Sequence, residues 1–320
     1  MKDTIFLMFK KFIPFVVLFL FIFLIIYFYK ENKSDFNFLY NLNLNFILIT
    51  LFLCLCYLVT ESLIFRNITI FFNAKINIFQ SFLIICTTYL CNTFVQFSGL
   101  GYRAYYLKKF KKVDISSFII KSIFIIFIEF MVFSSLSLIL LLVFDKINSE
   151  IEIYLAIYYI LLLIFFFSIV MLFFYKHIIK ILTKVTFLNE LSLVKKSISI
   201  INNFDKKKFD LFFKKYVFLF LLQFIILFLI FLNSYSLFEK ENSILFTIIS
   251  TMSTDLSFIF TLTPYAVGIS ETFIFFSSNN FDIQISEILF LTNIFRLSMF
   301  GIYFIFGLIN LFIFSRKIIK

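Results

Sequence analysis

Thr263-Pro264-Tyr265-Ala266-Val267-Gly268-Ile269-Ser270-Glu271 interrupts the long apolar run Ser243–Phe276 and decides how this part of the chain folds. Pro264 lacks a backbone donor and Gly268 permits a sharp bend, so a helix should break here. Inside a bilayer, a broken helix is tolerated only where protein buries it or where it lines a cavity. The carboxylate of Glu271 follows the break, at the start of a short predicted helix. An ionisable group at that depth indicates a functional site.

The chain around this break has the composition of an integral membrane protein. Of its 320 residues, 62% are hydrophobic and 56 are Phe, and the mean hydropathy is +1.05. Such values are typical of membrane proteins, so we expect a single membrane domain over residues 1–320. The net charge of +11 does not indicate a nucleic-acid partner, because nearly all the lysines lie in short loops between apolar segments.

The residues needed for metal or triad chemistry are too few. His177 is the only histidine and lies in the predicted basic loop of residues 176–215, so we expect neither a zinc cluster nor a Ser/His/Asp triad. The four cysteines lie inside apolar segments, where they are expected as small core residues. We therefore expect no metal and no cofactor, and a non-enzyme is favoured although enzyme activity stays open.

Eight apolar segments are long enough to span or enter a bilayer, which takes about 20 residues per helix. They are continuous rather than alternating, which predicts helices and not strands. The segments are Phe12–Tyr29, Phe46–Phe65, Phe79–Phe97, Phe118–Phe144, Ile153–Tyr175, Val217–Leu237, Ser243–Phe276 and Ile288–Phe314.

Lysine and arginine assign the loops to the two sides of the membrane. Both termini, the loop Ser98–Ile115 and the basic loop of residues 176–215, which holds ten lysines, should be cytoplasmic. Loops with few or no lysines should be external: Lys30–Asn45, Asp145–Glu152, Glu239–Asn242 and Ser277–Glu287. We expect the plasma (inner) membrane of a bacterium as the location.

Simple alternation of spans does not satisfy this assignment. Phe79–Phe97 must enter the membrane and return, with a turn at Ser98–Gly101 and a short arm at Tyr102–Phe110. Ser243–Phe276 must form a second hairpin from the opposite face. The order span, span, hairpin, span then repeats with inverted orientation over residues 1–150 and 151–320, as in many transporters.

The sequence thus predicts an all-α polytopic membrane protein with about six full transmembrane helices and two re-entrant helical hairpins in an inverted repeat. The alternative, that one or both hairpins are ordinary spans, stays open.

Arg103 and Glu271 occupy corresponding places, each in the first turn of a predicted returning arm. Glu271 suits the partial positive charge of a helix N-terminus. Arg103 does not, unless an anion such as a phosphate lies between it and the amides. The alternative is that both residues form ion pairs that only hold the hairpins together.

Three further ionisable residues fall in apolar segments: Glu129, Asp255 and Arg296. Each is costly unless it is paired in the protein interior, and Glu129 with Arg296 is a candidate pair. Glu61 and Lys121 are expected to reach the cytoplasmic interface and have no predicted role.

Pro264, Gly268 and Glu271 resemble the signature Pro-Gly-Gly-x-Gly-x-x-Glu of the lysylphosphatidylglycerol-synthase transmembrane region, a flippase-like family. Tyr265 and Ala266 replace the first two glycines of that signature.

An earlier motif of the family runs from an Asn through a Gly-rich turn to an Arg. Asn92, Gly99, Gly101 and Arg103 resemble it, whereas the usual proline is missing near Phe97.

The resemblance implies a membrane domain that moves an anionic phospholipid or a polyprenyl-phosphate-linked head group between leaflets. The chain ends at Lys320 without the soluble aminoacyl-transferase domain of the synthases, so lipid synthesis is not expected. The candidate substrate-binding residues are Arg103, Glu271, Gly99, Gly101, Pro264, Gly268, Asn92, Arg296, Asp255 and Glu129.

Two alternative functions stay open. One is a membrane-embedded transferase on a lipid carrier, with Glu271 or Asp255 as the base. The other is a non-catalytic subunit of an envelope-assembly complex. A homo-oligomer or an envelope-biogenesis partner fits any of these functions.

Overall fold

The computed structural model describes residues 42–72, 74–95, 97–145, 162–163, 165–167, 206–238, 243–259, 269–278 and 283–319, and every element in them is helical. Three of the helices are long and apolar enough to cross a membrane: Leu44–Ile70, Leu211–Phe238 and Ile285–Ile313. The predicted all-helical membrane protein is confirmed at this level. The predicted span Phe12–Tyr29 and nearly all of Ile153–Tyr175 lie outside the described residues.

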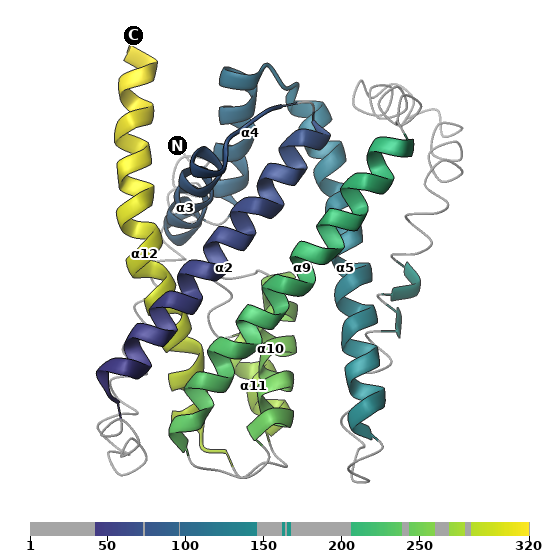
Figure 1. Cartoon of the computed structure of the whole chain (residues 1–320), viewed down its shortest axis with the longest axis vertical. Coiled ribbons are helices and arrows are strands. Elements are labelled where there is room, and N and C mark those ends of the chain that lie inside the picture. Colours follow the sequence, from purple (N-terminus) through teal and green to yellow (C-terminus); the bar gives the residue numbers. More distant parts are fainter. Residues whose placement is uncertain are drawn as a thin grey trace, which may run out of the picture. The chain divides into compact units, whose positions relative to one another are not determined.

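The described helices include the apolar segments and one basic helix, α4 (Ser98–Lys111; Figure 1). They are α2 (Leu44–Phe71), α3 (Ile78–Phe94), α4 (Ser98–Lys111), α5 (Ile115–Asp145), α9 (Lys206–Tyr235) with a 3₁₀ turn (Ser236–Phe238), α10 (Ser243–Ile259), α11 (Ile269–Ser278) and α12 (Ile285–Ile319). α9 begins within the predicted basic loop, so the last lysines of that loop are helical.

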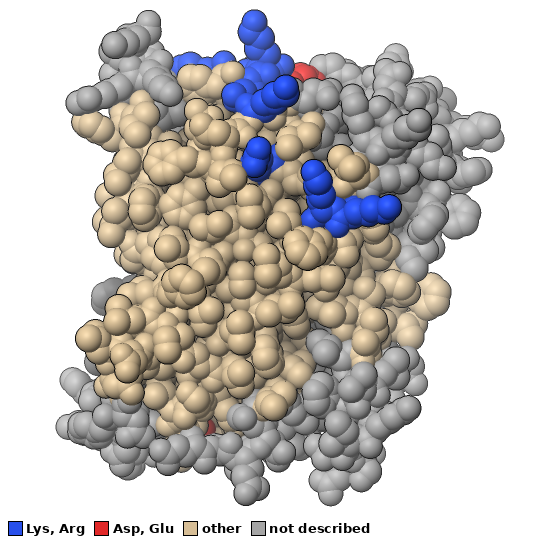
Figure 2. All heavy atoms as spheres, in the orientation of Figure 1, with Lys and Arg blue, Asp and Glu red and all other residues tan. Residues whose placement is uncertain are grey.

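The surface of α2 suits a lipid environment. Leu44, Leu48 and Phe52 recur every four residues, on one side of the helix, and are 70%, 54% and 63% exposed. The face in Figure 2 carries few charged side chains among the coloured residues. A large apolar surface of this kind marks a contact with membrane or protein rather than with water.

The described chain divides into two compact units. One contains α2 as far as Phe65, α3, α4 as far as Arg103, α9 from Leu222, and α10 to α12. The other contains the remaining parts of α2, α4 and α9 together with α5. The predicted inverted repeat of residues 1–150 and 151–320 stays a prediction.

α3 and α4 fold back on each other, as the first hairpin requires, but the turn lies earlier than predicted. α4 already begins at Ser98, so the turn is at Val95–Phe97 and not at Ser98–Gly101. Phe97 adopts a left-handed conformation with φ 61°, and Ser98 Oγ donates to the Val95 carbonyl at 2.6 Å. The two glycines therefore lie in the first turn of α4.

Gly99 allows the two helices to approach closely. A Cβ at this position would lie 2.4 Å from the Thr88 carbonyl oxygen and 2.6 Å from Thr88 Cγ2. The backbone N–H of Gly99 donates to Asn92 Oδ1 at 2.7 Å, which satisfies one of the free amides at the start of α4. Gly99, which was predicted to form part of the turn, therefore lies in the packing contact between α4 and α3.

The C-terminal helices form the rest of the same unit. α10 packs against α11, α11 against α12, and α12 against α3. Asn310 of α12 donates to Thr87 Oγ1 at 2.7 Å and to Tyr102 Oη at 2.8 Å, and so ties α12 to both arms of the first hairpin. Pro264 and Gly268, which were predicted to break the second hairpin, lie outside the described residues.

Candidate functional site

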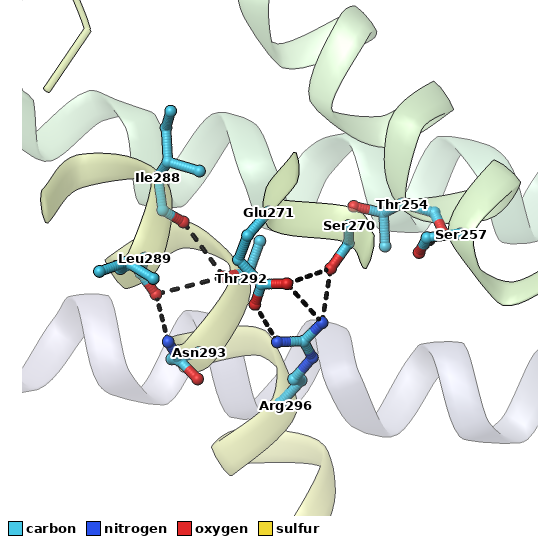
Figure 3. Close-up of polar contacts among 9 residues, drawn as sticks. All are labelled: Thr254, Ser257, Ser270, Glu271, Ile288, Leu289, Thr292, Asn293 and Arg296. Atoms are coloured by element: carbon cyan, nitrogen blue, oxygen red, sulfur yellow. Dashed lines mark hydrogen bonds and ion pairs between the residues drawn. The ribbon is translucent and has the colours of Figure 1, made fainter. Parts of the chain in front are cut away.

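Glu271 and Arg296 form a closed ion pair near the start of α11. Glu271 lies in the first turn of α11, the position predicted for it, where the helix dipole favours a carboxylate. Arg296 on α12 donates from Nη1 to Oε1 and from Nη2 to Oε2, and Nη2 also donates to Ser270 Oγ (Figure 3). Ser270 in turn donates to Glu271 Oε2 at 3.0 Å. The side chains are only 12% and 10% exposed, so this forked pair is buried and well satisfied.

Arg296 is thus paired with Glu271, whereas the pair predicted from the sequence was Glu129 with Arg296, which stays a prediction. Glu129, in the other unit, accepts a hydrogen bond from Tyr216 Oη of α9. The sequence identified both carboxylates as buried groups in need of partners. It could not tell which of them faces α12.

Arg103 has different surroundings. It is the sixth residue of α4, in the second turn, so the predicted position in the first turn is wrong. Its Nε donates to Thr88 Oγ1 at 3.0 Å, and its guanidinium carbon lies 5.1 Å from the centre of the Phe65 ring. These contacts fix the plane of the guanidinium group through a hydrogen bond and a cation–π contact.

The outer nitrogens of this guanidinium have only a loose pairing. Nη2 lies 3.6 Å from Glu61 Oε1, a distance of ion pairing but too long for a hydrogen bond. Among the described residues, no side chain or carbonyl accepts a hydrogen bond from either Nη of Arg103. Both side chains of the pair are 19% exposed. Arg103 thus retains the two nitrogen groups with which arginine binds carboxylates and phosphates.

Glu61 is the residue that the sequence analysis missed. Its Oε2 accepts a hydrogen bond from Gln223 Nε2 of α9 at 3.0 Å, while its Oε1 faces Arg103. It was assigned to the membrane interface because it lies near the end of an apolar segment. Glu129 was selected because an ionisable residue within a membrane helix indicates a functional site. Glu61 also lies within such a helix, so the same criterion could have selected it.

The other predicted site residues that the structure describes lie on several helices. Asn92 and Gly99 hold the first hairpin together, and a Cβ at Gly101 would meet nothing within 4 Å. Asp255 lies on α10 and is partly exposed.

Tyr57 of α2 packs against α12 in the interior of one unit. It lies one turn before Glu61 and is 5% exposed. Its ring meets that of Phe295, the neighbour of Arg296 in the sequence, edge to face at 5.7 Å. This contact joins the helix that carries Glu61 to the helix that carries Arg296.

No known protein family, curated protein or solved structure matches this chain. In the part of the chain that the structure describes, no group of three or more His, Cys, Asp and Glu side chains could hold a metal ion. The side-chain geometry around Arg103 is thus the main evidence on function.

Proposed function

We propose that this chain is a flippase-like membrane transporter that moves an anionic lipid or lipid-linked head group between leaflets, and that Arg103 binds the anion. The observation that carries the proposal is the contrast between the two arginines. The guanidinium of Arg296 is hydrogen-bonded to Glu271 and Ser270, whereas Arg103 is oriented at Nε and has only the 3.6 Å ion pair of Nη2 with Glu61 at its outer nitrogens.

A phosphate matches the outer nitrogens of Arg103 in charge and geometry. Planar guanidinium groups bind phosphate oxygens through two parallel hydrogen bonds, and such charge-assisted bonds are stronger than neutral ones. Glu61 lies at 3.6 Å and gives Arg103 a counter-charge when no ligand is bound. A phosphodiester head group would replace this loose pair with direct hydrogen bonds.

The finer topology belongs to the same proposal. Six full spans, two re-entrant hairpins in an inverted repeat, cytoplasmic termini and a bacterial inner membrane are predicted from the lysine distribution. The folding back of α3 on α4 and the packing of α10 on α11 support the two hairpins. The resemblance to the lysylphosphatidylglycerol-synthase transmembrane region supports lipid as the cargo.

A transferase that uses Glu271 as its base is less well supported. Both carboxylate oxygens of Glu271 accept hydrogen bonds from Arg296, which stabilises the ionised form and leaves little basicity for proton abstraction.

Proteoliposomes with fluorescent phosphatidylglycerol test the proposal, with the phosphatidylcholine analogue as the neutral comparison. The wild-type protein should transfer phosphatidylglycerol between leaflets faster than empty liposomes do, and faster than it transfers phosphatidylcholine. Arg103→Ala should slow this transfer by about 10- to 100-fold, because it removes charge-assisted hydrogen bonds. Lys108→Ala, an exposed cation on the same helix, should transfer at the wild-type rate. A wild-type rate no higher than that of empty liposomes would overturn the proposal.

A further inference from the structure

Two buried hydroxyl groups on α10 have no hydrogen-bond partner. Ser250 is 0% exposed and Thr254 is 4% exposed, and neither Ser250 Oγ nor Thr254 Oγ1 is hydrogen-bonded within the described structure. A buried hydroxyl without a partner costs about 1–3 kcal/mol, so each such group needs an explanation.

Ser81 of α3 and Tyr235 of α9 also have buried hydroxyls without a partner in the described structure, but Ser250 and Thr254 are two such groups on one helix. Other hydroxyl side chains of these helices are bonded. Thr87, Thr88 and Thr292 donate to the carbonyl four residues earlier, the usual solution in a membrane helix. On α10 itself, Thr251 donates to the Thr247 carbonyl at 2.7 Å and Ser257 to the Thr254 carbonyl at 2.6 Å. Ser250 and Thr254 do not use this solution, although the same carbonyl ladder is beside them.

Their position places the two hydroxyls on one side of the helix. Residues four apart lie one above the other on a helix, so Ser250 and Thr254 share a face. Figure 3 shows Thr254 and Ser257 beside Ser270, next to the pair of Glu271 and Arg296. The hydroxyl face of α10 thus borders the start of α11.

The charges beside this face restrict what it binds. The closed pair of Glu271 and Arg296 presents one negative and one positive group, each neutralised by the other. A cation there would meet the guanidinium and an anion would meet the carboxylate. An uncharged group that both donates and accepts hydrogen bonds suits two free hydroxyls best, and a polyol provides such groups.

We infer that Ser250 and Thr254 form a subsite for the uncharged hydroxyl groups of a glycerol or sugar head group. This inference rests on the proposed function, in which Arg103 binds the phosphate of the same class of lipid. Both places lie within the same compact unit.

Thermal stabilisation of the purified protein in detergent separates the two claims. Phosphatidylglycerol and phosphatidylmethanol carry the same single charge, but only phosphatidylglycerol has head-group hydroxyls, and phosphatidylcholine is the neutral reference. The wild-type melting temperature should rise with both anionic lipids, and phosphatidylglycerol should give the larger rise.

The double variant Ser250→Ala/Thr254→Val should lose only the preference for phosphatidylglycerol. Its apparent affinity for that lipid should fall about tenfold, because two neutral hydrogen bonds are removed, while the response to phosphatidylmethanol is unchanged. In phosphatidylcholine it should melt no lower than the wild-type protein, since the substitutions remove no internal hydrogen bond. Thr251→Val, a buried position on the same helix whose hydroxyl is bonded to Thr247, should keep the preference.

Three results would overturn the subsite. In the first, the wild-type protein is stabilised equally by phosphatidylglycerol and phosphatidylmethanol. In the second, the double variant keeps the full preference for phosphatidylglycerol, which would mean that the two hydroxyls bind only water. In the third, Thr251→Val loses this preference as much as the double variant does. If neither anionic lipid stabilises the wild-type protein beyond phosphatidylcholine, the proposed function itself fails.

Discussion

Arg103 and Arg296 differ in their neighbours. The guanidinium of Arg296 is hydrogen-bonded to Glu271 and Ser270, which joins α12 to α11. Arg103 is oriented by Thr88 and Phe65 and has only a loose pairing with Glu61. We therefore propose a structural role for Arg296 and ligand binding for Arg103.

Glu61→Gln tests whether Glu61 competes with a ligand for Arg103. The change keeps the acceptor for Gln223 and removes the charge that faces the guanidinium. A partly exposed pair contributes about 1 kcal/mol or less, so the affinity for phosphatidylglycerol should rise by up to about fivefold. The affinity is measured by titrating phosphatidylglycerol and following the melting temperature of the protein. A lower affinity would show that Glu61 itself supports lipid binding.

Glu271→Gln should destabilise the protein. It leaves Arg296 buried beside a neutral amide, and the loss of one partner from a buried pair costs about 3–5 kcal/mol. Thermal unfolding in detergent should therefore occur at a clearly lower temperature. Arg296→Gln combined with Glu271→Gln should recover part of the loss, since no lone charge remains. Wild-type melting of Glu271→Gln would contradict a structural role for the pair.

At the scale of elements, the hairpin of α3 and α4 depends on one glycine and not on the other. Gly99→Ala should destabilise the protein by about 1–3 kcal/mol, because the new Cβ would lie 2.4 Å from the Thr88 carbonyl oxygen. Gly101→Ala should stabilise it by about 0.5–1 kcal/mol, because it adds helix propensity where a Cβ meets nothing. Urea or thermal unfolding of the two variants gives the sign of each effect. Equal effects would contradict the observed packing of the hairpin.

The sequence predicts that the chain turns back between α3 and α4, but the predicted position of the turn is wrong. Gly99 and Gly101 are unusual in an apolar run, and this pattern predicts the turn at the glycines. The turn uses Phe97 in a left-handed conformation, which few large residues adopt and which no local pattern indicates. Gly99 instead lets α4 pack closely on α3. This role could not be predicted from the sequence, because it depends on Thr88 of α3 facing Gly99 in the folded chain.

At the scale of the molecule, composition was enough to predict membrane helices, because long apolar runs are a one-dimensional signal. Which side chains of different helices form pairs could not be predicted from the sequence. Glu271 and Arg296 were both identified, but they lie 25 residues apart and meet only through the packing of α11 on α12. Glu61 was passed over because its partners, Arg103 and Gln223, come from two other helices.

The proposal of two re-entrant hairpins predicts on which side of the membrane the loops lie. In a variant that lacks the four native cysteines, single cysteines at Arg66 and Lys112 should react with an impermeant reagent from the same side. Cysteines at Lys240 and Asn279 should both react from the opposite side, since each hairpin returns to the face it entered. Reaction of either pair from two different sides would show that its segment crosses the membrane.

The central claim is that Arg103 binds the anionic part of a lipid, and its most direct measurement is lipid-induced thermal stabilisation of Arg103 variants. Phosphatidylglycerol should stabilise the wild-type protein more than phosphatidylcholine does. Arg103→Lys should keep part of this difference, because it retains the charge and loses the fork. Arg103→Ala should lose the difference and remain folded in phosphatidylcholine. If phosphatidylglycerol stabilises Arg103→Ala as fully as the wild-type protein, the claim is wrong and Arg103 is structural.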